Sequence, residues 1–200
     1  MELSARFEEA LVFAHRLHAK QRRKGSGIPY IGHLLAVTAL VLEYGGDENE
    51  AIAALLHDAI EDQGGDATRQ EIRRRFGDAV VEIVNGCTDA ESIPKPPWQA
   101  RKETYIAHLH TATSSILLVS AADKLHNIRS ILNDYRAVGE DLWSRFKAGK
   151  QGTLWYYRSL LEVYKEYYPT LLTEELERAM RELETLVTGT TDPHPDTPSL

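Results

Sequence analysis

The chain has 200 residues and a formal net charge of −7 at pH 7, and 42% of its residues are hydrophobic. An acidic protein is repelled by nucleic acids and by anionic lipid surfaces, so we expect neither a nucleic-acid nor a membrane partner. The length predicts one compact domain with a substantial core. The single cysteine, Cys87, excludes an internal disulfide and favours a reducing compartment.

The first 20 residues contain several acids and no long apolar run, unlike a secretory signal peptide or a membrane span. No later segment reaches the thickness of a bilayer without charged residues. We therefore expect a cytoplasmic protein.

The first third of the chain shows apolar residues at helical spacing. Ser4 is expected to cap a helix that runs to about Gln21, and a basic, glycine-rich loop of sequence QRRKGSGIPYIG follows. A second helix is expected at about 33–44, and a third, capped by Asp47, through about Asp62.

The rest of the chain continues this helical pattern. The sequence TRQE at 68–71 predicts a capping box that opens a helix ending at Phe76 and Gly77, and another short helix is expected to end near Cys87. Three prolines make a regular helix impossible over 90–98. Further helices are expected at 99–110, 114–134, 140–147, 152–167 and 173–187.

These patterns predict an all-α fold, a single compact bundle of about eight to ten helices over residues 1–187. We find neither an internal repeat nor a convincing β-hairpin. Residues 188–200 are rich in threonine and proline and contain almost nothing apolar, so we expect a disordered tail.

Side chains that commonly bind metals lie beside apolar runs in three separated segments. The stretch AALLHDAIED places His57 and Asp58 in a segment that otherwise resembles a buried helix, where unpaired charge is unfavourable. His33 leads into the apolar sequence LLAV, and Asp123 follows the apolar sequence ILLV closely. A lone His-Asp pair is usually a surface detail, but the co-occurrence of these segments favours a shared metal site.

Two imidazoles and two carboxylates form a mixed ligand set that suits Mn²⁺, Fe²⁺ or Zn²⁺, and the absence of thiolates disfavours a structural zinc site. Glu61 and Asp62 lie one helical turn beyond the His-Asp pair, where they are candidates to accept a proton from a water molecule. The other histidines are expected to be packed or solvated, and His126 is expected to have a structural role.

Four motifs together resemble the hydrolase domain of RelA/SpoT homologues and of the MESH-like small alarmone hydrolases, within the HD-domain superfamily of metal-dependent phosphohydrolases. They are RKGSGIPYIGHLLAV, LLHDAIED, FGDAVVEIVNGCTD and SAADKLHNIRS. The resemblance covers roughly residues 7–135. It implies removal of the 3′-diphosphate from the alarmones ppGpp and pppGpp, usually with Mn²⁺, to give pyrophosphate and GDP or GTP.

The resemblance also implies roles for individual residues. The implied metal ligands are His33, His57, Asp58 and Asp123, and the implied catalytic pair that activates water is Glu61 and Asp62. The implied nucleotide contacts are Arg23, Lys24 and Asn127. Further candidates for phosphate or base contacts are Arg101, Lys102, Lys124, Arg129, Trp155 and Tyr156, although a solvated or packed role is the usual one for such residues.

Two departures leave the nucleotide open: Gln63 stands where the family commonly has threonine, and Leu34 where it often has proline. Because no synthetase domain follows, we expect hydrolysis only. The substrate could instead be ppApp or another nucleotide with a 3′- or 2′-phosphate, such as NADPH. A non-catalytic nucleotide-binding HD protein is the third reading, and the sequence leaves a homo-oligomer open.

Overall fold

A computed structural model describes residues 2–89 and 94–189. These residues form ten α-helices and one 3-10 helix, and no β-strand occurs among them, which confirms the predicted all-α fold. The segment 90–93 and most of the predicted tail lie outside the described residues. None of the described helices is both long enough and apolar enough to span a membrane.

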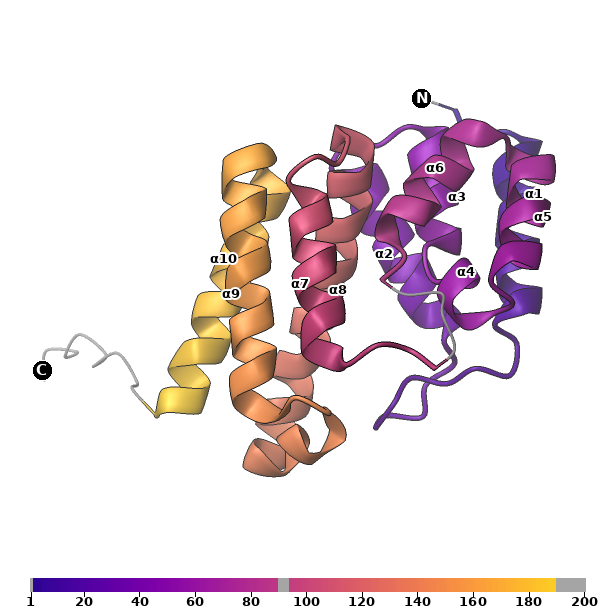
Figure 1. Ribbon diagram of the computed structural model, residues 1–200. Helices are drawn as coiled ribbons and strands as arrows, with labels where there is room; N and C mark the ends of the chain where they lie inside the picture. The colour runs from indigo at the N-terminus through magenta and orange to yellow at the C-terminus, as the bar shows by residue number, and fades with distance from the viewer. Residues whose placement is uncertain (1, 90–93, 190–200) are drawn as a thin grey trace, which may run out of the picture.

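The first six helices gather at one end of the molecule (Figure 1). Their bounds are α1 Ala5–Leu17, α2 Ile31–Glu43, α3 Glu48–Leu56, α4 Ala59–Asp62, α5 Asp66–Phe76 and α6 Asp78–Cys87. The 25-residue helix α8 (Ser114–Val138) contacts both this group and the C-terminal helices. The other elements are α7 Trp98–Leu109, the 3-10 helix η1 Gly139–Arg145, α9 Gly149–Tyr167 and α10 Leu171–Thr188.

Two of the predicted helix starts are confirmed by their capping bonds. The Ser4 hydroxyl accepts the backbone N–H of Arg6 at the start of α1. Asp47 and Glu50 form a complete capping box at the start of α3, in which each side chain accepts a backbone N–H of the other residue. These bonds satisfy backbone donors that have no partner within the helix.

The predicted capping box at residues 68–71 is wrong. Helix α5 begins at Asp66, after two glycines with positive φ angles, Gly64 and Gly65. Thr68 therefore lies inside the helix, and its hydroxyl donates to the carbonyl of Gln63 at 2.6 Å instead of accepting a backbone N–H. The glycines turn the chain into the helix earlier than the capping pattern suggested.

The expected third helix is interrupted at His57 and Asp58, two of the predicted metal ligands. Helix α3 ends at Leu56, and α4 begins at Ala59, so His57 and Asp58 lie at the junction between the two. The predicted helix at 140–147 is a 3-10 helix, and the first helix ends at Leu17, before Gln21.

One hydrophobic cluster extends through the described residues and includes side chains from every long helix. Helix α8 has a buried stretch, Ile116–Ala122, that leads directly to Asp123. The polar ligand-type residues predicted from the sequence therefore lie at the edge of the core, where apolar packing from several helices holds their backbone in place.

Candidate metal centre and its pocket

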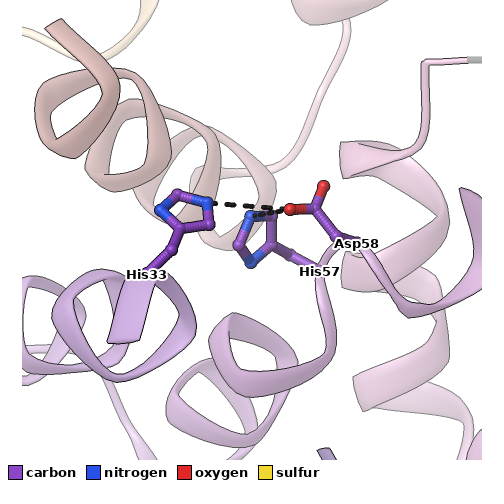
Figure 2. A group of neighbouring side chains, drawn as sticks. All are labelled: His33, His57 and Asp58. Carbon is purple, nitrogen blue, oxygen red and sulfur yellow. Dashed lines mark ion pairs between the residues drawn. The ribbon is translucent and has the colours of Figure 1, made fainter. Parts of the chain in front are cut away.

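The four predicted metal ligands approach one another from three parts of the fold, and His33, His57 and Asp58 form the tightest group. His33 lies in the first turn of α2, His57 and Asp58 at the α3–α4 junction, and Asp123 on α8. The Nε2 atom of His33 lies 3.2 Å from Asp123 Oδ1 and 3.6 Å from Asp58 Oδ2. The Nε2 atom of His57 lies 3.0 Å from Asp58 Oδ2 and 3.6 Å from Asp123 Oδ1. Figure 2 shows both imidazoles directed toward the Asp58 carboxylate.

The buried Nε2 atom of His57 supports a cation at this point. The ring Nδ1–H donates to the backbone carbonyl of Ala54 at 2.8 Å, which leaves Nε2 to face the two carboxylates. Nε2 is fully buried, and no described atom meets it with hydrogen-bond geometry, although Asp58 Oδ2 is near. A buried nitrogen without a hydrogen-bond partner, beside two carboxylate oxygens, is the arrangement that a divalent metal ion completes.

The second imidazole has an unusual partner. His33 Nδ1 lies 2.8 Å from Nδ1 of His126, which comes from α8 one turn after Asp123. The His126 ring is half-buried, and this burial, together with His33 and Arg23, lowers its pKa to about 4. The His126 imidazole is therefore neutral near pH 7.

The electrostatics of the site keep both aspartates ionised. Burial opposes the charged form of Asp58, but His57 and His33 outweigh it and hold the pKa of the Asp58 carboxyl well below its usual range. Burial likewise opposes ionisation of Asp123, whose pKa is held low chiefly by the Lys124 ammonium group, 2.6 Å away. The two carboxylates are therefore available as anionic ligands near neutral pH.

The two candidate catalytic carboxylates have different surroundings. Glu61 is paired with Lys95 at 2.6 Å and accepts the backbone N–H of Asp89 at 3.3 Å. Asp62 is exposed, and among the described residues its side chain accepts one hydrogen bond, from the Gln21 amide to Oδ2 at 2.8 Å. Glu61 and Asp62 therefore line the same pocket as Asp58 and Asp123. Glu61 is paired with a cation, whereas Asp62 accepts a hydrogen bond from a neutral amide.

A polar pocket of about 210 Å³ opens beside the two aspartates of this set. Its lining includes the predicted ligands Asp58 and Asp123 and the candidate catalytic residues Glu61 and Asp62. The ammonium groups of Lys102 and Lys124 also line it. The other lining residues are Tyr30, Cys87, Asp89, Tyr105, Asn127 and Tyr156. Lys102 donates to Asp89 at 2.7 Å, and burial together with the nearby Lys124 lowers the pKa of Lys102.

The remaining predicted nucleotide contacts divide into two groups. Asn127 and Tyr156 line the pocket, and Arg23 reaches it by donating to Asn127 Oδ1 at 2.9 Å. The Tyr156 hydroxyl is buried and has no hydrogen-bond partner among the described residues. By contrast, Lys24 is exposed in the loop before α2, and Arg129 pairs with Glu175 of α10 at 3.3 Å.

Arg101 and Trp155, the other two candidates for phosphate or base contacts, have different surroundings. Arg101 donates to Asp89 at 2.7 Å, next to the Lys102 contact, so both cations converge on one carboxylate. Trp155 packs edge-on against Trp98, with ring centroids 6.0 Å apart, and does not line the pocket.

Three residues in or beside the pocket were not predicted from the sequence. The Tyr30 hydroxyl donates to Asp58 Oδ2 at 2.6 Å, Asp89 gathers two cations, and Gln21 holds Asp62. Tyr30 and Asp89 fall inside motifs that were recognised, PY and TD, but neither belongs to a ligand pattern. Only their contacts with residues distant in sequence reveal their positions.

Comparison with known proteins decides the family. A family model described as HD domain matches residues 10–154. The chain belongs to the HD domain family. A solved structure from work on a metazoan ortholog of SpoT that hydrolyzes ppGpp matches this HD protein with a TM-score of 0.76 and 25% identity, over 92% of this chain and 98% of that one. A Listeria monocytogenes EGD-e structure matches with a TM-score of 0.67 and 29% identity, over 76% of this chain and 97% of that one.

Curated relatives agree with the resemblance seen in the motifs. The Xenopus tropicalis guanosine-3′,5′-bis(diphosphate) 3′-pyrophosphohydrolase MESH1 is 39% identical over 126 residues, 62% of this chain and 68% of the relative. An Aquifex aeolicus guanosine-3′,5′-bis(diphosphate) 3′-pyrophosphohydrolase is 36% identical over 124 residues, 62% of this chain and 17% of the relative. A Streptomyces coelicolor GTP pyrophosphokinase is 39% identical over 127 residues, 62% of this chain and 14% of the relative. This HD protein thus spans less than a fifth of the two longer relatives.

Proposed function

We propose that this protein is a metal-dependent pyrophosphohydrolase that removes the 3′-diphosphate from ppGpp and pppGpp. Water is consumed, the bond between the ribose 3′-oxygen and the diphosphate is broken, and the products are pyrophosphate and GDP or GTP. The observation that carries the proposal is the convergence of His33, His57, Asp58 and Asp123 beside a polar pocket. The names of the MESH1 and Aquifex relatives support the choice of substrate.

The same four residues would hold the metal. Their mixed nitrogen and oxygen atoms suit Mn²⁺, Fe²⁺ or Zn²⁺, and we propose Mn²⁺ because the resemblance to the alarmone hydrolases implies it. A divalent cation bound there supplies Lewis acidity that polarises a phosphoryl group and makes a water molecule more acidic. The proposed location is the cytoplasm, which is consistent with a single free cysteine.

Asp62 is the better placed of the two carboxylates to receive the proton of the attacking water. Only its Oδ2 atom is hydrogen-bonded among the described residues, so Oδ1 is available to accept a proton. Glu61 is engaged by Lys95 and by the backbone of Asp89, and we assign it to orienting the water.

The charge balance of the pocket explains why the substrate and the cation would bind together. The lining contains five carboxylates, from Asp58, Glu61, Asp62, Asp89 and Asp123, and two ammonium groups. An anionic diphosphate would be repelled by this excess of negative charge. A divalent cation reduces the excess, and Lys102 and Lys124 then provide the local positive charge on the pocket wall.

The direct test is pyrophosphate release from ppGpp by the purified protein in the presence of Mn²⁺. Asp58→Ala and Asp123→Ala are expected to lose metal binding and turnover together, because each removes a carboxylate ligand. The control is Asp141→Ala, which changes an exposed aspartate of η1 and should leave both unchanged. Full turnover by either ligand variant would refute the proposal.

The same assay identifies the nucleotide. Side-by-side reactions with ppGpp, ppApp and NADPH should show the highest kcat/KM for ppGpp. A higher kcat/KM for another nucleotide would leave the proposed metal chemistry intact but would identify a different substrate. Metal binding without turnover of any of the three would instead favour a non-catalytic nucleotide-binding protein.

A further inference from the structure

We propose that His126 is a positioning residue that sets the tautomer of the metal ligand His33. The Nδ1 atoms of the two rings lie 2.8 Å apart, and the ring centroids are separated by 4.8 Å. This inference rests on the proposed metal centre but not on the identity of the substrate.

The direction of the hydrogen bond follows from what a metal ligand needs. His33 faces Asp58 and Asp123 through Nε2, so Nε2 must carry a lone pair for the cation, and the proton must be on Nδ1. His33 Nδ1–H then donates to Nδ1 of His126. His126 can accept this bond only as a neutral ring whose own proton is on Nε2.

The other histidine ligand shows why this arrangement differs from the usual one. His57 donates its Nδ1–H to the Ala54 carbonyl, an acceptor whose character never changes. Ligand histidines commonly donate to a carbonyl, a carboxylate or water. His33 instead depends on a second imidazole, which acts as an acceptor in one tautomer and as a donor in the other.

The fold holds His126 in this position through the helix that also carries a ligand. His126 follows Asp123 by three residues on α8, so both side chains lie on the same face of the helix. One turn of α8 therefore contacts the metal centre directly through Asp123 and indirectly through His126 and His33. This pairing links α2 to α8 at the site.

The test compares Mn²⁺ affinity across two substitutions at this position, measured by equilibrium dialysis with Mn²⁺ alone at neutral pH. His126→Leu introduces an apolar side chain of similar size and so removes the acceptor. It should weaken Mn²⁺ binding by about 10- to 100-fold. His126→Asn keeps an acceptor oxygen near the position of Nδ1, and it should lose less than about tenfold. His110→Leu, at the exposed C-terminal end of α7, is the matched control and should bind as the native protein does.

Two further measurements separate positioning from a packing role. Thermal unfolding of the metal-free variants shows whether His126→Leu is folded, and rescue by His126→Asn excludes a requirement for the ring itself. Nitrogen-15 NMR of the native protein loaded with diamagnetic Zn²⁺ should show His33 protonated on Nδ1 and His126 protonated on Nε2.

The outcomes distinguish this inference from the proposed function. Unchanged Mn²⁺ affinity in folded His126→Leu, or a proton on Nδ1 of His126 in the Zn²⁺ form, would overturn the inference and leave the metal centre intact. Failure of the native protein to bind Mn²⁺ would overturn both.

Discussion

At the scale of single residues, Gln21 connects the proposed base to a chain of neutral groups. The Oε1 atom of Gln21 accepts from His18 Nδ1 at 2.7 Å and also from the amide of Gln63. Both donors fix the orientation of the Gln21 amide, so its NH₂ group is turned toward Asp62 Oδ2. Gln63 is one of the two departures from the family motifs, and its amide makes this contact.

The network predicts the behaviour of a Gln21→Leu variant. Removing the amide frees the Asp62 carboxylate to rotate, and a misplaced base is expected to lower kcat by about 10- to 100-fold. Mn²⁺ affinity should stay unchanged, because Asp62 is not among the proposed ligands. Steady-state kinetics and metal dialysis check both parts.

The control for this prediction is Gln151→Leu, which alters an exposed glutamine of α9. It should retain native kinetics. An unchanged kcat in Gln21→Leu would show that the network does not position Asp62.

At the scale of elements, the close approach of α6 to α8 holds the helix that carries Asp123. A Cβ atom added at Gly86 would lie 2.5 Å from Cδ1, 2.7 Å from Cγ1 and 2.8 Å from Cγ2 of Ile116. Gly86 is buried within α6, and its missing side chain allows the β-branched Ile116 to pack directly on the helix backbone. This contact lies two turns before Asp123 along α8.

Gly86→Ala should therefore destabilise the protein, although alanine is the better helix former. Overpacking costs about 1–3 kcal/mol. Because three Ile116 atoms would lie within 2.8 Å of the new Cβ, we expect this cost to exceed the gain of about 1 kcal/mol in helix propensity. Denaturant unfolding monitored by circular dichroism measures the difference.

The matched control is Gly32→Ala in α2, where Ile28 Cγ2, at 3.9 Å, is the one described atom within 4 Å of the new Cβ. Gly32 is exposed and helical, so alanine should be neutral or stabilising there. Equal stability changes at the two positions would contradict the packing explanation.

At the scale of the whole molecule, negative charge is concentrated at the pocket of a protein that is already acidic overall. Five carboxylates line one pocket, and the chain carries a net charge of −7. Cations elsewhere are largely used in surface pairs, such as Arg73 with Asp78 and Arg158 with Glu184. A divalent cation at the metal centre would relieve repulsion that the folded state otherwise retains.

Mn²⁺ should consequently raise the melting temperature of the metal-free protein. Selective binding to the folded state at a hundredfold excess over Kd stabilises it by about 2.7 kcal/mol. Differential scanning calorimetry with and without a chelator measures the shift. Asp58→Asn, which removes one carboxylate ligand, should reduce it, whereas Asp141→Asn should not.

Local sequence was sufficient to predict the helical fold and to single out the residues that we propose as metal ligands. Apolar spacing and capping at Ser4 and Asp47 involve residues within one or two turns of each other, so a single segment contains the whole signal. The ligand types of His33, His57, Asp58 and Asp123 were recognisable because each interrupts or borders an apolar run.

Tertiary structure alone decided how these side chains meet. It placed the break between α3 and α4 at His57 and Asp58, directed Arg129 toward Glu175, and brought His126 onto His33. His126 and His33 are 93 residues apart in the chain, and the periodicity of either helix contains no information about the other. Such contacts depend on how buried faces pack together, which is a property of the assembled core and not of any one segment.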